Sequence, residues 1–226
     1  MELQSIKDRI PDYAKDLRLN LDAVLNRSSL TPAQANGAAL AAAFAAKSAP
    51  LVAALRETPN VARHLHVPLQ SGDDRILRAM GRRYDSGTFL RRVATLADFN
   101  LTTDVIVGFP GEDEEAFGRT LDVVAEAGIT KVHAFPYSPR PGTETAAADP
   151  VSREVKRERS ERLREQSRLA SLERWHAKVG RDDVVLVDRP GRGYGDDYSP
   201  WLVRGEVGEL VPVRGRAVTE EGILAA

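Results

Sequence analysis

The stretch 102–107 combines β-branched and apolar residues in the pattern of a buried parallel strand. It ends at 108–111, Gly-Phe-Pro-Gly, which is a turn signal, and the acidic residues 112–115 suit the positive end of a helix. Apolar positions then recur at helical spacing from Phe117 until Gly128, and a second strand is expected at 131–135. This order predicts a βαβ unit, in which ligands sit at the carboxyl ends of the strands.

The glycines of that turn allow two interpretations. Gly108 and Gly111 either let the backbone approach a ligand closely or only form the turn, and spacing alone favours the turn. Upstream, the stretch 64–74 begins as a strand and ends in a polar turn. Short helices follow it, and Ser86 can cap the second of them.

The pattern of the first 55 or so residues indicates helices and no strands. Apolar residues recur at helical spacing from Leu3 to Val24, and Thr31-Pro32 is a strong helix start signal. The alanine-rich segment that follows through Ala54 indicates helices that pack closely. A packed helical bundle is therefore expected in this part of the chain.

The last third predicts a long helix and then a small β-barrel. Residues 152–178 are rich in Arg and Glu, which favours solvated i,i+4 pairs over an RNA-binding face. Short apolar runs separated by glycines then suggest the strands of a barrel. The expected strands are 184–187, 201–203, 209–213 and 216–218.

Composition adds two restrictions. The 226 residues contain no cysteine, which excludes disulfides, thiol catalysis and thiolate-bound metals or clusters among them. The net charge is -1 overall, but 151–178 holds nine Lys or Arg against five Asp or Glu, while 181–226 holds six against nine. The acidic tail argues against a general attraction to phosphate. No apolar run is long enough to span a membrane and the N-terminus lacks a signal pattern, so a cytoplasmic location without membrane contact is expected.

His64 and His66 fall on the same face of the expected strand. Two such imidazoles can bind a metal, but no third ligand is evident nearby, so packing in the core or at its mouth is the favoured interpretation.

Two resemblances extend these predictions. Residues 10–21 and 29–32 resemble the N-terminal helices of the D-type alkyl hydroperoxidases, a helical family that uses a Cys-x-x-Cys pair. That pair lies beyond the similar region and has no counterpart here, so no catalytic residue is carried over.

From about Leu55 onward, four motifs in order resemble the C-terminal half of a radical S-adenosylmethionine tRNA methylthiotransferase, of the threonylcarbamoyladenosine-type branch. The motifs are 64–74, 80–83, 104–112 and 133–143, and a charged helix and a TRAM-like barrel follow them. The resemblance implies tRNA as partner and methylthiolation of adenosine at C2 beside the anticodon. The family's Cys-x-x-x-Cys-x-x-Cys motif, which holds a 4Fe-4S cluster, is absent, so we expect no independent catalysis.

The same resemblance implies a partial S-adenosylmethionine site and an RNA contact. Arg82 is suited to a bidentate contact with the methionine carboxylate. In the expected TRAM loop, Tyr194 and Gly195 replace the family's Arg and Thr, and Arg192 is the compensating candidate. The implied cofactor-binding residues are Gln70, Ser71, Arg82, Asp104, Ile106, Gly108, Phe135 and Tyr137, and the implied RNA-binding residues are Arg192 and Tyr194.

The expected architecture is α/β: a partial radical SAM barrel between an N-terminal all-α segment and a small β-barrel. The expected segments are 1–56 helical, 57–150 partial barrel, 151–180 connecting helix and 181–226 TRAM-like barrel. A second chain that supplies the missing barrel half is a further expected partner. Three alternatives stay open: an RNA-binding module without catalysis, an alkyl hydroperoxidase-like helical protein that lacks its cysteine pair, and a fusion without function.

Overall fold

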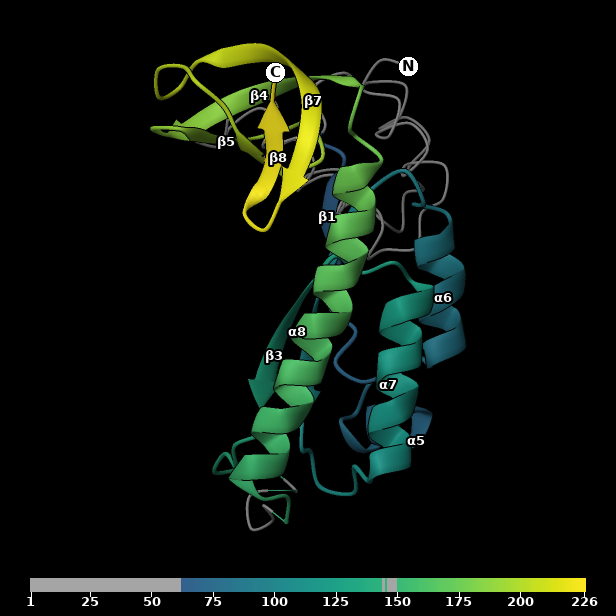
Figure 1. Cartoon of the computed structure of the whole chain (residues 1–226). Helices are drawn as coiled ribbons and strands as arrows, with labels where there is room; N and C mark the ends of the chain where they lie inside the picture. The colour runs from purple at the N-terminus through teal and green to yellow at the C-terminus, as the bar shows by residue number, and fades with distance from the viewer. Residues whose placement is uncertain (1–61, 144, 146–149) are drawn as a thin grey trace, which may run out of the picture. The chain divides into compact units, whose positions relative to one another are not determined.

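The computed structural model describes residues 62–143, 145 and 150–226, so the helical segment expected at 1–56 lies outside the described residues. Residues 63–226 form one compact unit (Figure 1). A parallel β/α segment comes first and a closed five-stranded β-barrel follows it, which confirms the expected α/β class.

Three parallel strands form the sheet, in the order β1-β2-β3. They are β1 (His64–His66), β2 (Asn100–Val107) and β3 (Lys131–Pro136). The eight residues of β2 include the predicted strand 102–107, and they pair with β1 at their start and with β3 further along. Most of β2 is buried, as its apolar and β-branched composition requires of a central strand.

Three helices connect these strands: α5 (Asp74–Ala79), α6 (Ser86–Ala94) and α7 (Glu114–Glu126). Each begins at an aspartate whose carboxylate accepts backbone N–H groups of the first turn. The prediction that Ser86 caps its helix is wrong, because Asp85 accepts the N–H of Thr88 and Ser86 is already the first helical residue.

The long helix α8 (Arg153–His176) packs against β3 and α7, and Ser152, the first residue of the predicted helical stretch, is its N-cap (Figure 1). The expectation that its charges are solvated fails at two positions. Lys156 and Arg159 are 4% and 5% exposed, because both side chains turn inward and find polar partners in the β/α segment.

The barrel is closed in the order β4-β5-β6-β8-β7. Its core contains Trp201, and Trp175 of α8 packs against that core. The bounds of the strands are β4 (Asp182–Arg189), β5 (Arg192–Tyr194), β6 (Pro200–Leu202), β7 (Leu210–Thr219) and β8 (Gly222–Ala225).

The strands differ from the sequence prediction in two ways. The runs 209–213 and 216–218 belong to one strand, β7, with a register shift near Gly215 rather than a turn. A Cβ atom at Gly215 would lie 2.3 Å from the carbonyl oxygen of Lys178, so this glycine allows β7 to pass close to the end of α8. The short strands β5 and β8 are missing from the prediction because neither contains a run of alternating apolar residues.

Candidate functional site

Three predicted cofactor-binding residues share one face of the parallel sheet, here called the polar face. Asp104 and Ile106 alternate with buried residues of β2, and the register places Phe135 beside Ile106. The Phe135 ring is 52% exposed, and Asp104 and Ile106 are partly exposed. The polar face thus offers a carboxylate, an aliphatic side chain and an aromatic ring towards the carboxyl ends of the strands.

Gln70 joins the sheet through its backbone. It pairs with Val105 in an isolated parallel bridge, accepting the N–H of Ile106 and donating its own N–H to the carbonyl of Asp104. Its φ of 70° lies in the left-handed region, which is uncommon for a residue other than glycine and is often found at functional sites. Gln70 is therefore held rigidly at the carboxyl edge of the sheet.

The three residues after Gln70 connect helices α5 and α7 through hydrogen bonds and an ion pair. Ser71 is fully buried, with its hydroxyl 3.4 Å from Thr120 Oγ1, and the N–H of Gly72 donates to the same oxygen. Asp73 caps α5 and forms an ion pair with Arg119 of α7 at 2.5 Å. The polar groups of Ser71, Gly72 and Asp73 are therefore already hydrogen-bonded or ion-paired, and they hold α5 and α7 in place.

A buried polar network lies beneath the Gly108 turn. The N–H of Gly108 donates to Glu112 Oε2 at 2.6 Å, and Arg159 Nη1 donates to the same oxygen at 2.8 Å. Gly108 has φ 74°, and a Cβ atom there would lie 2.6 Å from the Lys156 side chain. Lys156 therefore fills the space beside the turn, and it donates to the carbonyl of Tyr137.

Sequence reasoning missed this network, although Glu112 belongs to one of the family-like motifs. Burial raises the pKa of Glu112, and the Gly108 N–H and the Arg159 charge only partly oppose this effect. Among the described residues, neither Glu112 Oε1 nor Arg159 Nε has a hydrogen-bond partner. The one sequence signal was the pair of basic residues one turn apart in α8, Lys156 and Arg159, which the general charge of the helix hid.

Two further predicted cofactor-binding residues, Arg82 and Tyr137, lie outside the strands. Arg82 is exposed in the loop after α5. Tyr137 follows β3, packs edge-on against Phe109 with ring centroids 5.2 Å apart, and donates its hydroxyl to the carbonyl of Thr145. The structure brings Asp104, Ile106 and Phe135 together on one face. Tyr137 packs against the same apolar cluster as Ile106, the cluster that contains Phe109.

The two histidines of β1 are hydrogen-bonded within the sheet. His66 Nδ1 lies 3.0 Å and His64 Nε2 lies 3.3 Å from Thr102 Oγ1, and His66 Nε2 lies 3.2 Å from Asp104. Burial and then the charge of His66 lower the pKa of His64. Among the described residues, the group of side chains that could hold a metal ion contains neither imidazole.

The residues present fit only one of the two groups that the resemblance implies. A 4Fe-4S cluster needs thiolates, and no residue of the chain supplies one. S-adenosylmethionine fits in part, because an exposed ring and a carboxylate lie side by side on the polar face, whereas Ser71 and Gly108 are already covered by protein.

A pocket of about 590 Å³, here called the cationic pocket, lies beside β3. Its walls come from the first residues of the three parallel strands, from α8 and from the β5–β6 region of the barrel. The basic residues among them are Lys131, Arg164 and Arg168, and none of its described lining residues is acidic.

The predicted RNA contact Tyr194 lies at the rim of this pocket. Its ring stacks on Tyr198 with centroids 4.3 Å apart and planes within 5°. Tyr198 is 54% exposed, and its φ of 63° is unusual for a large side chain. The other predicted contact, Arg192, forms an ion pair with Glu221 and is thus partly neutralised.

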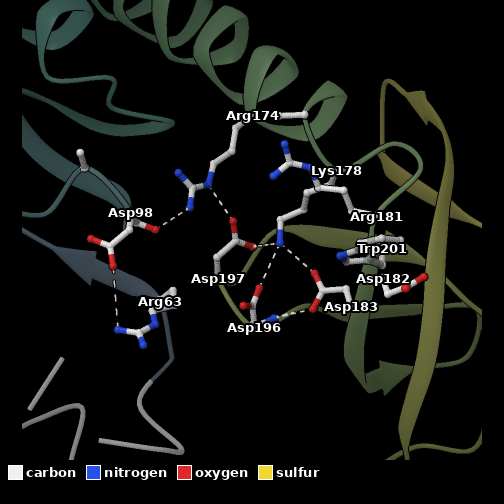
Figure 2. A pocket seen from close by; sticks show the side chains of 12 residues that line it. Arg63, Asp98, Arg174, Lys178, Arg181, Asp182, Asp183, Asp196, Asp197 and Trp201 are labelled. Atoms are coloured by element: carbon white, nitrogen blue, oxygen red, sulfur yellow. Dashed lines mark hydrogen bonds and ion pairs between the residues drawn. The ribbon is translucent and has the colours of Figure 1, made fainter. Parts of the chain in front are cut away.

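A second pocket, of about 390 Å³ and here called the clamp pocket, lies where α8 meets the barrel (Figure 2). Lys178 Nζ is 2.8 Å from Asp183, 3.0 Å from Asp196 and 3.1 Å from Asp197. These three aspartates are close enough together to hold a cation, but the ammonium group of Lys178 already contacts all three. The cluster is therefore neutralised by the protein itself.

The loop that carries Asp197 is also bound to the parallel sheet. Arg174 donates to Asp197 Oδ2 at 2.7 Å, and Asn100 Nδ2 donates to the carbonyl of Asp197 at 2.9 Å. Burial alone raises the pKa of Asp197, but the Lys178 charge and the Arg174 hydrogen bond outweigh it and hold the pKa below its ordinary value. The clamp pocket is thus a junction that joins the barrel, α8 and β2.

None of the helices described for this chain has the length and apolar character needed to cross a membrane.

Comparisons with known proteins agree with this architecture. Residues 40–124 match the radical SAM superfamily. The chain is 50% identical over 191 residues to the tRNA-2-methylthio-N(6)-dimethylallyladenosine synthase of Thermobifida fusca. This match covers 78% of this chain and 38% of that protein. The enzyme of the same name from Bifidobacterium longum is 46% identical over 180 residues, 76% of this chain and 37% of the relative.

The chain is also similar to an enzyme whose name gives threonylcarbamoyladenosine instead of dimethylallyladenosine. The threonylcarbamoyladenosine tRNA methylthiotransferase MtaB of Thermotoga maritima is 36% identical over 186 residues, 77% of this chain and 43% of that protein. The chain thus resembles tRNA methylthiotransferases over about three quarters of its length, and it spans well under half the length of these curated relatives.

Proposed function

We propose that this chain is the S-adenosylmethionine-facing and tRNA-binding part of a protein related to the tRNA methylthiotransferases, and that these 226 residues do not catalyse methylthiolation by themselves. The proposal is supported by the radical SAM match and by the 36% to 50% identity with tRNA methylthiotransferases of both branches. The relatives' names concern tRNA, so tRNA is the proposed partner.

The single observation that carries the cofactor part is the grouping on the polar face. An exposed aromatic ring, Phe135, lies next to Ile106, and the carboxylate of Asp104 is one position along the same face. An adenine ring can stack on Phe135, while Asp104 accepts hydrogen bonds from amino or hydroxyl groups. Arg82, which is exposed, is the proposed partner of the methionine carboxylate.

Radical chemistry in this family depends on an iron–sulfur cluster. Because the chain contains no cysteine, no reaction step through that cluster is assigned to it. A chain that supplies the missing barrel half remains the proposed source of the thiolates. A cytoplasmic location also stays a prediction.

The substrate branch is the finer part of the proposal. The sequence motifs predict the threonylcarbamoyladenosine-type branch, whereas the identities to the two dimethylallyladenosine synthases, 50% and 46%, exceed the 36% to the threonylcarbamoyladenosine enzyme. These identities favour a dimethylallyl-bearing adenosine. Binding of anticodon stem-loops that carry one or the other modification separates the two.

Calorimetric titration of the full chain with S-adenosylmethionine tests the cofactor part. We expect micromolar binding that Arg82→Ala weakens about tenfold, because a bidentate guanidinium–carboxylate contact is lost. Arg83→Ala is the matched control, since Arg83 is the adjacent exposed arginine. No heat of binding in folded protein, or equal losses in both variants, would refute the assigned site.

A specific observation favours a second candidate, an RNA-binding module that works without any cofactor. The cationic pocket contains basic and aromatic side chains and is lined by no described acidic residue. If this candidate is right, the chain binds tRNA with a steep salt dependence whether or not it binds S-adenosylmethionine. Binding of both ligands favours the first proposal over this one.

A further inference from the structure

We propose that the cationic pocket holds an unpaired nucleotide of the bound RNA, with its base against the Tyr194–Tyr198 stack and its phosphate between Lys131 and Arg164. This inference rests on the proposed tRNA binding and names the part of the chain that performs it. The pocket adjoins the polar face, since His66 in its wall lies 3.2 Å from Asp104, but neither Asp104 nor Phe135 lines it.

The charge of the pocket is the first argument. No described residue forms a hydrogen bond or ion pair with the Lys131 ammonium or the Arg164 guanidinium. The third cation, Arg168, forms an ion pair with Glu165, with Nη2 and Oε1 2.7 Å apart. Unpaired cations that face one cavity attract an anion, since no neighbouring carboxylate cancels their field. Phosphate is the anion that RNA presents.

The aromatic rim is the second argument. Tyr198 stacks on Tyr194, and the His64 ring lies 5.1 Å from Tyr198 with a tilt of 32°. Stacking on aromatic side chains is the usual means by which proteins hold unpaired bases, and it requires no particular base sequence. A half-exposed tyrosine in the left-handed region is costly, which suggests that its position serves a purpose beyond packing.

The size and position of the pocket fit a single nucleotide. Its volume of about 590 Å³ lies within the range of small-ligand sites. Asn100 and Thr130 in its wall mark the amino ends of β2 and β3, whereas the proposed cofactor site lies towards the carboxyl ends. Asn100 and Asp104 are four residues apart in β2, roughly 13 Å along the strand, so the two sites are neighbours on one sheet.

A free nucleotide and an RNA strand share this chemistry, and the structure favours the strand. The aromatic pair belongs to the barrel while two of the cations belong to α8, so the site joins two elements that can both contact a longer chain of phosphates. Experiments with both ligands distinguish the two sources.

Fluorescence anisotropy of the full chain with a labelled anticodon stem-loop RNA tests the inference. The variants are Lys131→Gln with Arg164→Gln, and separately Tyr198→Asn, which removes the ring and keeps a residue that tolerates positive φ. The charge-matched control is Arg153→Gln with Arg157→Gln, two exposed arginines of α8 that do not line the pocket. Tyr198→Phe retains the ring, and circular dichroism verifies that each protein is folded.

We expect the Lys131 and Arg164 double variant to weaken binding roughly tenfold and to lower the salt slope by about 0.7, the value for one phosphate contact on a single strand. Tyr198→Asn weakens binding about fivefold or more and leaves the salt slope unchanged, whereas Tyr198→Phe restores affinity. The control pair changes affinity less than twofold.

Each other outcome overturns a defined claim. If RNA binds with a steep salt slope but pocket and control variants lose affinity equally, the pocket assignment is wrong and the proposed tRNA binding stands. If no RNA binds to folded protein, both fail. If adenosine monophosphate binds at micromolar concentration in a direct calorimetric titration and the RNA does not bind, the site belongs to a free nucleotide and the RNA assignment is wrong.

Discussion

The clamp pocket and the cationic pocket both contain several basic side chains, yet they use them in opposite ways. In the clamp pocket four basic residues face five acidic ones, and Lys178 lies within 3.1 Å of three aspartates. In the cationic pocket three basic residues face none, and two of them have no charged partner among the described residues.

The two pockets illustrate how a charge that stabilises the fold differs from one that is available to a ligand. A charge that is already paired and partly buried contributes to the position of the elements that carry it, and its removal leaves its partners uncompensated. A charge that faces a cavity without a partner contributes little to folding and remains available to a ligand. Counting basic residues along the sequence does not distinguish the two.

The largest expected effect comes from Lys178→Met. The substitution leaves Asp183, Asp196 and Asp197 close together without their ammonium, so we expect the free energy of unfolding to fall by about 2–4 kcal/mol. Urea denaturation followed by circular dichroism measures it. A loss of less than about 0.5 kcal/mol would show that the cluster is solvated and does not act as a clamp.

Asp197→Asn is expected to cost about 1–3 kcal/mol at neutral pH, since Arg174 and Lys178 both lose a charged partner. The pKa of Asp197 is lowered, so its contribution is present above the ordinary value of 3.8 and is lost as pH falls through the lower folded value. Stability of the wild type should therefore decline more steeply below about pH 4 than that of the variant. Parallel declines in denaturation curves between pH 2 and 6 would contradict this.

Asn100→Ala sharpens the comparison, because Asn100 lines the cationic pocket and also donates to the carbonyl of Asp197. The variant leaves the buried carbonyl of Asp197 without this donor, while the Thr130 hydroxyl keeps the carbonyl of Leu101, so we expect a loss of about 1–2 kcal/mol in stability. RNA affinity of the folded variant should change less than twofold. A large loss of affinity at unchanged stability would place Asn100 in the RNA site instead.

The smallest expected effect on stability comes from Lys131→Met, the same substitution as at Lys178 but in the cationic pocket. Lys131 is exposed and has no ion-pair partner among the described residues, so the free energy of unfolding should change by less than about 0.5 kcal/mol. Urea denaturation of the two Lys→Met variants side by side measures the contrast. Equal losses would remove the distinction between the pockets.

Much of the fold was predictable because its signals are local. The strand at 102–107, the turn at Gly108 and the helix that ends at Gly128 follow from periodicity and turn chemistry, and all are found. The barrel strands β5 and β8 escaped prediction because each is too short to show a period of two. Their existence depends on pairing with distant strands, which no local pattern records.

The candidate site was predictable only in part, for a similar reason. Alternation along β2 places Asp104 and Ile106 on one face, but the register that adds Phe135 depends on how β3 docks. Ser71 has the right residue type in the right motif, yet it is fully buried against Thr120. A motif records which residues occur together and not which atoms remain free.

The residue pattern alone was enough to predict a parallel β/α segment and a small β-barrel, and the absence of cysteine excluded a thiolate-bound cluster among the 226 residues. Which basic side chains form ion pairs and hydrogen bonds within the protein became clear only from the folded structure. In the sequence, Lys156, Arg159 and Lys178 cannot be told apart from the other basic residues in and just after α8. In the structure, each contacts polar groups of other segments of the chain. Arg164 meets none among the described residues, because electrostatic energy depends on distances that the chain acquires only when it folds.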